Sequence, residues 1–211
     1  MATSARAASG LRERKRRALR ARLVAIAGER FLADGYDATN MRAVADAAGV
    51  AYQTLYNHFP NKARLALAWV TTRLDEATSA AGALAAIETG DPLASILAAA
   101  DHYVRFVDGI DRRLWREATS EYLHAPEQAD EVNAFELLGP ATQLRELLER
   151  ERRAGTLAPE TDVATLADVL FVLIDHAILR FVVLEEMTPE GALEELHAQL
   201  ELVLGPRLTV R

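Results

Sequence analysis

Apolar residues recur along this chain mostly three or four positions apart, which is the spacing of one face of an α-helix. Near the N-terminus, Leu19, Leu23, Ile26, Ala27 and Phe31 form such a stripe. Glycine, proline and capping side chains interrupt the stripes. The pattern predicts about nine helices and no credible strand: one that the basic run 12–22 leads into and Gly35 ends, one from Asn40 to Gly49, one over about 52–58, one from Asn61 to about Ala86, one from Asp91 to about Gly109, one over about 111–124, one from Pro126 to Gly155, one from Pro159 and Thr161 to about Glu186, and one from Thr188 to Gly205.

The composition also favours an all-α protein, with room for one or two compact domains in 211 residues. There is no Cys, which excludes disulfides, thiol catalysis and thiolate metal sites. The longest apolar run, 169–184, is interrupted by Asp175, His176 and Arg180 and is shorter than the roughly 18 residues of a membrane span. No apolar core of a secretory signal follows the N-terminus. We therefore expect a cytoplasmic protein without a membrane partner.

Charge is divided unevenly along the chain. The formal net charge is −7, yet residues 1–65 hold 12 Lys and Arg against 5 Asp and Glu. The remaining residues hold 12 basic and 26 acidic side chains. A basic N-terminal part on an acidic remainder indicates that only the N-terminal part meets a polyanion.

The segment 39–65, TNMRAVADAAGVAYQTLYNHFPNKARL, reads as two short helices joined by a turn at Gly49. Gly49 supplies the positive φ that ends the first helix. Leu55 and Phe59 are predicted to face the core. Polar and aromatic side chains occupy the remaining positions of the second helix. This arrangement is typical of a helix-turn-helix that reads double-stranded DNA through the major groove.

Each predicted DNA-contacting side chain has a chemical reason. Gln53 can form the bidentate pair to adenine N6 and N7, and Thr54 can reach a phosphate, a base edge or a thymine methyl group. Tyr52 offers a ring and a hydroxyl. Lys62 and Arg42, at the starts of their helices, suit phosphates. The full predicted DNA-binding set is Asn40, Arg42, Tyr52, Gln53, Thr54, Tyr56, Asn57, His58 and Lys62. The basic run 12–22 is expected to be either an arm along the minor groove or a solvated face.

From Arg22 to Leu65 the chain resembles the DNA-binding domain of the tetracycline-repressor (TetR) family. The resemblance rests on AAGV, on TLYNHF, and on Lys62 three residues after Phe59. It implies an N-terminal three-helix helix-turn-helix domain joined to a C-terminal helical ligand-binding and dimerisation domain. It supports DNA contacts by Gln53, Thr54, Tyr56, His58 and Lys62. We accordingly expect a disordered arm over 1–10, a DNA-binding domain over 11–60, and a ligand-binding and dimerisation domain over 61–211.

Three positions depart from the family pattern. Ala51 stands where the family usually has a capping Ser. Ala43 and Arg64 stand where acidic residues usually complete capping boxes. Each missing bond is worth on the order of 1 kcal/mol or less, so we interpret these departures as differences in local stability.

The last two predicted helices suit a subunit interface. The helix over about 161–186 is apolar nearly all the way round, so it must be buried on several sides. The helix over about 188–204 carries a narrower stripe of leucines and a valine. Two such helices from each of two chains form a four-helix interface, and the family pairs its subunits in this way. The sequence thus predicts a homodimer, with a monomeric core as the alternative.

Aromatic and polar residues of the body are candidates for contact with a small apolar or amphipathic effector. They are Trp69, His102, Tyr103, Phe106, Trp115, Tyr122, Phe135, Asp175 and His176. Ordinary core packing is the alternative for each of them. Asp175 and His176 interrupt the most apolar helix, and a buried charge needs a partner.

The resemblance implies a dimeric transcriptional regulator, most simply a repressor that a ligand releases from its operator, with no enzymatic activity and no cofactor. Two other functions remain open. One is a DNA-binding regulator without a ligand. The other is a helical-bundle metalloenzyme that uses the E-x-x-H pairs Glu121–His124 and Glu194–His197. No nucleophile–base spacing and no Gly-rich phosphate loop supports an enzyme. The sequence leaves the effector, the operator and activation versus repression undetermined.

Overall fold

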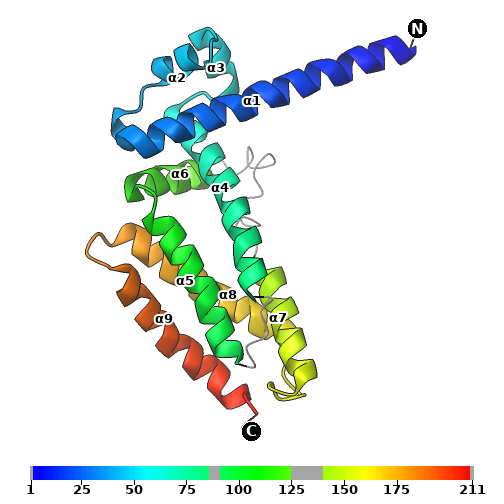
Figure 1. Cartoon of the computed structure of the whole chain (residues 1–211), viewed down its shortest axis with the longest axis vertical. Helices are drawn as coiled ribbons and strands as arrows, with labels where there is room; N and C mark the ends of the chain where they lie inside the picture. The colour runs from blue at the N-terminus through cyan, green and yellow to red at the C-terminus, as the bar shows by residue number, and fades with distance from the viewer. Residues whose placement is uncertain (1, 86–90, 125–139, 210–211) are drawn as a thin grey trace. The chain divides into compact units, whose positions relative to one another are not determined.

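The computed structural model describes residues 2–85, 91–124 and 140–209, apart from the side chains of residues 2–9, 75, 77–85, 140 and 141. Within these ranges the structure is helical (Figure 1). The helices are α1 (Ala2–Ala38), α2 (Met41–Ala47), α3 (Tyr52–His58), α4 (Lys62–Ala85), α5 (Pro92–Asp108), α6 (Arg112–His124), α7 (Pro140–Ala154), α8 (Val163–Val183), α9 (Pro189–Leu204) and the 3-10 turn η3 (Gly205–Arg207). The predicted all-α fold class is confirmed. The predicted helix start at Pro126 lies outside the described residues.

The chain divides into two compact units. The first comprises Met1–Val70 and Arg113–Ala125, and the second comprises Thr71–Arg112 and Pro126–Arg211. Helices α4 and α6 each contribute residues to both. The first unit continues past the boundary predicted at residue 60, because the first turns of α4 are buried with α1 and α3 in its core.

Capping side chains fix several helix starts where the sequence places them. The Asn40 carboxamide oxygen accepts the backbone N–H of Arg42, and the Asp91 carboxylate accepts those of Leu93 and Ala94. The Thr188 hydroxyl accepts the N–H of Gly191 ahead of α9. Each such bond satisfies an N–H that the first helical turn leaves without a partner, so these caps set the register of the helices that follow.

Three local features differ from the prediction. Backbone helix begins at Ala2, where the small polar composition indicated disorder; Ala and Arg, both strong helix formers, dominate the residues that follow. Gly35 does interrupt α1, with φ 79° and ψ 169°, and a short helical stretch resumes after it. Helix α8 begins at Val163, because Asp162 accepts the N–H of Thr165 and thereby caps it.

The core of the first unit joins α1, α2, α3 and the start of α4. Its fully buried side chains include Leu23, Leu55, Phe59 and Leu65. Leu55 and Phe59 therefore take the inward positions predicted for them. In Figure 1, α2 and α3 lie against the C-terminal half of α1, while the N-terminal half of α1 continues away from them. This core holds α3 with its opposite face exposed.

The second unit is a bundle in which α5 and α8 pack against α9, and α7 packs against α8 (Figure 1). Its core contains Ile96, Leu148, Leu170, Leu196 and Leu200. A single antiparallel bridge between Leu157 and Leu208 ties the end of the chain to the α7–α8 connection. No helix among the described residues combines the length and the apolar character needed to cross a bilayer.

Candidate nucleic-acid interface

The turn between α2 and α3 is built from backbone bonds and one arginine. Gly49 has φ 63°, a left-handed conformation that glycine adopts without steric cost. The N–H of Val50 donates to the carbonyl of Ala45 at 3.0 Å, which closes the end of α2. The Arg22 guanidinium of α1 donates to the carbonyl of Ala48. Helix α1 therefore stabilises the turn through Arg22, a role that no local sequence pattern indicates for this residue.

The outer face of α3 presents an exposed row of side chains. Tyr52 and Tyr56 are 39% and 46% exposed, and their ring centroids lie 6.3 Å apart. Gln53 and Asn57, each the next residue after one of these tyrosines, are also exposed, and Thr54 is half-buried. The Gln53 Nε2 donates to Asn57 Oδ1 at 3.0 Å. This bond uses one hydrogen of the Gln53 amide and leaves its oxygen and second hydrogen for an adenine edge.

Helix α2 contributes Arg42 beside this row. Its guanidinium carbon lies 5.0 Å from the centre of the Tyr52 ring, and the side chain is exposed. Asn40, also exposed, uses its side-chain oxygen to cap α2. Arg42 thus stands next to the α3 face, where a cation can meet a phosphate.

Lys62 lies in a different environment from the open phosphate site expected of it. Its Nζ donates to the carbonyl oxygens of Tyr36 at 2.7 Å, Asp37 at 3.2 Å and Thr39 at 3.2 Å. The ammonium also sits 4.3 Å from the centre of the Tyr36 ring. All three ammonium hydrogens are therefore donated within the protein, so a phosphate contact would require the exchange of one of these bonds.

His58, half-buried, lies beside the core at the C-terminal end of α3. Its ring centroid is 6.4 Å from that of Phe59. The Arg20 guanidinium carbon of α1 lies 4.5 Å from the centre of the same Phe59 ring. Arg20 therefore contacts the core residue that follows α3, whereas its sequence indicated only membership of a basic run.

The structure also accounts for Arg64, one of the departures from the family pattern. Asn61 Oδ1 accepts the Arg64 backbone N–H at 2.6 Å. The Arg64 guanidinium approaches the Glu121 carboxylate of α6 to 4.0 Å, and both side chains are largely buried. An ion pair thus occupies the position of a capping-box acid. At Ala51 the prediction holds, because α3 has no side-chain cap.

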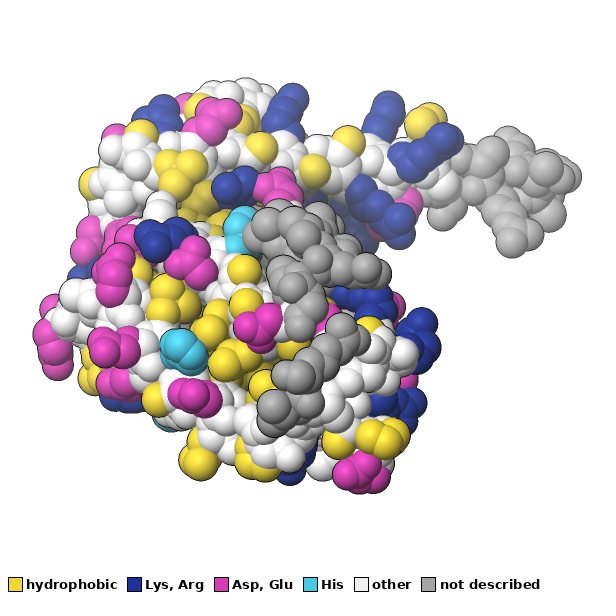
Figure 2. Space-filling view, turned by 60° about the horizontal axis from the view of Figure 1, so that its bottom comes forward, with side chains coloured by type: hydrophobic (Ala, Val, Ile, Leu, Met, Phe, Trp, Pro, Cys, Tyr) yellow, Lys and Arg dark blue, Asp and Glu magenta, His cyan; other side chains and the backbone are white. Residues whose placement is uncertain are grey.

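Basic side chains continue along α1 beyond the helix-turn-helix. Figure 2 shows dark blue side chains on the part of α1 that projects from the rest of the first unit. Arg12, Arg14, Lys15, Arg16 and Arg17 are all exposed there. The charge asymmetry of the sequence thus appears as a cationic surface on one helix.

The predicted effector residues divide between the two units. Trp69, Trp115 and Tyr122 belong to the first unit, where Trp69 is 5% exposed and its ring lies 6.0 Å from that of Phe31. Trp69 therefore takes a core position in the DNA-binding unit instead of a position in the body. Phe135 lies outside the described residues.

The other candidates lie in the second unit. Tyr103 is buried and packs with Phe106 and Ile178. The His102 ring lies 6.3 Å from that of Tyr103, and no described residue forms a hydrogen bond with its buried Nε2. The pKa of the half-buried Asp175 carboxyl is raised by burial, an effect that His176 opposes. Of these residues, Tyr103 is the one whose packing joins α5 to α8, through Ile178.

A narrow cavity of about 20 Å³ lies beside Tyr103. Helices α5, α7 and α8 surround it, and its lining is apolar apart from Tyr103 and Gln143: Ile96, Ala99, Ala100, Leu144, Leu147 and Ile174. Of the predicted effector residues, Tyr103 is in this lining. It is a candidate ligand site of the second unit.

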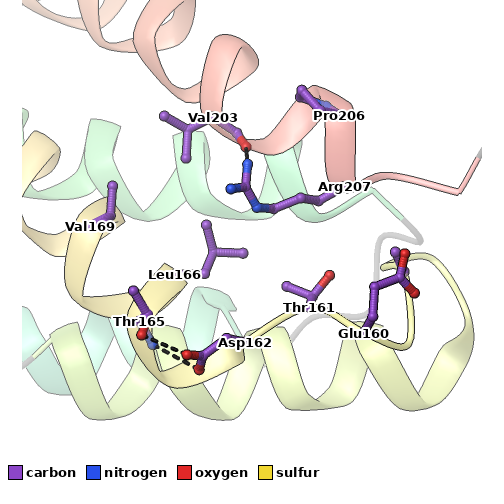
Figure 3. Close-up of a pocket in the computed structure, with 10 residues that line it drawn as sticks. Glu160, Thr161, Asp162, Thr165, Leu166, Val169, Val203, Pro206 and Arg207 are labelled. Carbon is purple, nitrogen blue, oxygen red and sulfur yellow. Dashed lines mark hydrogen bonds between the residues drawn. The ribbon is translucent and has the colours of Figure 1, made fainter.

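A wider, open hollow of about 340 Å³ lies where the start of α8 approaches the end of α9 (Figure 3). Thr161, Leu166 and Val169 line one side, and Val203 and Arg207 line the other. The dashed lines in Figure 3 mark the bonds by which Asp162 caps α8 through Thr165. The predicted effector residues that the structure describes are not in the lining of this hollow.

Glu194 and His197, the second E-x-x-H pair, are exposed on α9, and the first pair has other partners. Glu121 pairs with Arg64 and accepts from Asn61 at 3.3 Å, and the His124 Nδ1 lies 2.7 Å from the carbonyl oxygen of Ser120. Among the residues that the structure describes, no group of three His, Asp or Glu side chains is placed to hold a metal ion.

Comparison with known proteins agrees with this geometry. Residues 23–69 match the family described as bacterial regulatory proteins, tetR family. The chain is also similar to the HTH-type transcriptional regulator TcmR of Streptomyces glaucescens, with 42% identity over 72 residues. That similarity covers 34% of this chain and 31% of TcmR, so it spans less than a third of the relative.

Solved structures share the fold over almost the whole chain. Thermus thermophilus FadR, a TetR-family repressor solved in complex with lauroyl-CoA, aligns with a TM-score of 0.66 and 24% identity, covering 91% of this chain and 96% of FadR. A TetR-family transcriptional regulator from Pectobacterium atrosepticum aligns with a TM-score of 0.67 and 22% identity, covering 93% and 97%. The solved structures thus share the fold, while the family match over residues 23–69, from within α1 to the first turns of α4, and the similarity to TcmR identify the chain as a member of the TetR family of bacterial transcriptional regulators.

Proposed function

We propose that this protein is a dimeric transcriptional repressor that binds a near-palindromic operator and is released from it by a small apolar or amphipathic molecule. The observation that carries the proposal is the exposed α3 face, where Tyr52, Gln53, Tyr56 and Asn57 stand on a helix fixed by its own core and by the Gly49 turn. As a TetR-family regulator the protein is not an enzyme. We place its action in the bacterial cytoplasm, where the chromosome lies.

DNA recognition follows from the shape and chemistry of α3. An α-helix fits the major groove, where each base pair presents a distinct set of donors and acceptors. Gln53, oriented by Asn57, reads an adenine, and Tyr52 and Thr54 contact neighbouring groups. Arg42 meets a phosphate beside them. In this proposal α3 reads the bases, and the cations around it position the protein on the phosphate backbone.

Dimerisation is supported by an apolar stripe that α8 leaves exposed. Val169, Val172, Leu179 and Val183 follow helical spacing and are 41%, 61%, 45% and 53% exposed. The exposed His176 lies in the same stripe. A helix face of this composition is unfavourable in water, so a second subunit is the expected cover. A twofold dimer then presents two α3 helices to two half-sites on one side of the duplex.

The α9 helix adds to this interface. Leu202 is 78% exposed, and Leu196 and Leu200 on the opposite side are buried in the subunit's own core. The proposed interface therefore uses both of the helices that the sequence predicted, about 161–186 and 188–204, with one face of each held by its own subunit.

Effector binding is proposed for the cavity beside Tyr103. Its lining suits an apolar chain, and the side chains of Tyr103 and Gln143 in that lining suit a polar end. The cavity is narrow here, so an effector must bind a wider state in which α5, α7 or α8 has moved. A ligand shifts an equilibrium only through different affinities for two states. The lauroyl-CoA bound to FadR of similar fold is a molecule of the proposed amphipathic class. A regulator without a ligand is the second candidate.

The test of DNA reading is Gln53→Ala. DNA fragments that the wild-type protein selects from the genome supply the operator, and binding is measured on this operator and on a scrambled duplex. Loss of the Gln53 contact should weaken operator binding by about 1–3 kcal/mol, roughly five- to 150-fold, and leave the scrambled duplex nearly unaffected.

Glu29, exposed on α1 and outside the predicted DNA-contacting set, provides a control, since Glu29→Ala should change neither affinity. Equal weakening by Gln53→Ala on both duplexes would reject base reading by this residue. Failure of the wild-type protein to bind any fragment at low ionic strength would reject the proposed function.

A further inference from the structure

The N-terminal part of α1 is an uncovered helix rich in positive charge. No residue from Gly10 to Arg22 is buried, and the buried part of α1 begins after them, at Leu23. We call residues 11–22 the basic arm. The arm is part of one helix with the core of the first unit and shares its direction (Figure 1). The sequence left open whether this run is an arm in the minor groove or a solvated face.

The basic arm carries far more positive charge than it neutralises. It holds seven Lys and Arg side chains and a single carboxylate, Glu13. Glu13 pairs with Arg16 at 3.1 Å and Arg17 at 3.2 Å. Arg12, Arg14 and Lys15 have no ion pair within the described part of the chain. Such a density of like charge on one helix is unfavourable unless a polyanion is near.

We propose that the basic arm binds the phosphate backbone of duplex DNA flanking the half-site that α3 reads. The proposal rests on the proposed function, because it needs α3 to be seated on DNA. The width of the helix determines which part of the duplex the arm can contact. An α-helix with side chains is about 10–12 Å wide and the minor groove is about 6 Å wide. A helical arm therefore does not thread the minor groove and meets phosphates from outside.

The arm begins next to the reading helix. Arg20 stacks on Phe59 at the end of α3, and Arg22 holds the turn before α3. At about 1.5 Å per residue, Arg12 lies about 12 Å further along the helix than Arg20. That length corresponds to roughly three to four base pairs at 3.4 Å each. The arm is thus placed to lengthen the contact with the duplex by part of a helical turn.

Phosphate contacts of this kind carry no sequence information. Each one releases a counterion, so it steepens the fall of log affinity with log salt by about 0.9. The arm should therefore strengthen binding to operator and non-operator DNA by the same factor. It should also extend the protected region of the operator at its outer ends.

The experiment replaces five arm cations by Gln, a residue of similar helix propensity: Arg12, Arg14, Lys15, Arg16 and Arg17. The probes are the genomic fragment selected by the wild-type protein and a mixed-sequence duplex of the same length. We expect the slope of log affinity against log salt to become shallower by at least about 2. Affinity at low salt should fall more than tenfold on both probes, and hydroxyl-radical protection should shorten at its outer ends.

A matched control removes the same charge from the second unit, with Arg105, Arg145, Arg150, Arg152 and Arg153 changed to Gln. It should leave the slope and the footprint unchanged, and circular dichroism confirms that both variants remain folded. An unchanged slope in the arm variant would overturn the inference, and so would a loss on the operator alone, which would indicate base reading. A wild-type protein that binds neither probe would instead refute the proposed function.

Discussion

At the scale of single residues, the neighbouring groups determine whether a charged side chain binds within the protein or remains open to solvent. Lys62 and Lys15 are both lysines of the basic N-terminal part, yet Lys15 is exposed and Lys62 donates to three carbonyl oxygens. Those carbonyls belong to Tyr36, Asp37 and Thr39, where the chain leaves α1 and approaches α2. Lys62 thus fixes the connection on which the position of the helix-turn-helix depends.

We predict that Lys62→Met destabilises the protein by about 1–3 kcal/mol, because half-buried carbonyls lose a charged donor. For a chain of this size this corresponds to a decrease of several degrees in melting temperature. Thermal unfolding followed by circular dichroism measures it. Lys15→Met is the control and should stay within about 0.5 kcal/mol of wild type. Equal melting temperatures for Lys62→Met and wild type would show that the three bonds are not needed for stability.

At the scale of elements, the contact between α1 and α4 depends on a residue without a side chain. Gly28 lies in α1 among buried residues, and the Trp69 indole of α4 occupies the space where a Cβ would stand. Trp69 cannot easily move away, because it is packed against Phe31. Close approach of the two helices thus requires glycine despite its poor helix propensity.

The Gly28→Ala variant separates the effect of helix propensity from the effect of packing against Trp69. Helix propensity alone predicts a gain of about 1 kcal/mol from Ala, whereas overpacking against Trp69 costs about 1–3 kcal/mol or more. We expect net destabilisation, read from urea unfolding. In the exposed Ala21→Gly control on the same helix, propensity acts without a clash and stability should fall by up to about 1 kcal/mol. A Gly28→Ala protein more stable than wild type would contradict this packing.

At the scale of the whole molecule, the exposed stripe on α8 is the feature on which the proposed dimer depends. Two half-sites require two α3 helices in a fixed relation, and a single chain has one. The second-unit core already buries one face of α8 through Leu166, Leu170 and Ile174. The opposite face, with Val172 at 61% exposure, is the surface that we propose the partner subunit covers.

We predict that Val172→Glu raises the dimer dissociation constant more than thirtyfold, because a buried, unpaired carboxylate at an interface centre costs at least about 2 kcal/mol. Sedimentation equilibrium measures the change. Leu32→Glu is the control, since Leu32 is 60% exposed on α1 and lies outside the proposed interface. A Val172→Glu protein that dimerises like wild type would remove this face from the interface.

The local order of the chain could be predicted from the sequence. Helix periodicity, the caps at Asn40, Asp91 and Thr188, and the turn at Gly49 depend on residues only a few positions apart. The exposed row on α3 follows from the same periodicity, because the apolar Leu55 fixes which face is buried. The positive charge of the N-terminal part could also be predicted, because charged residues are counted directly in the sequence.

Contacts between distant residues were decided only by the tertiary structure. It brought Lys62 to the end of α1, Trp69 onto Gly28, and Glu121 to Arg64, pairs that no local pattern connects. It also moved Trp69, Trp115 and Tyr122 into the DNA-binding unit. An aromatic ring suits a core and a ligand site equally well by composition. Only the neighbours that folding supplies distinguish the two.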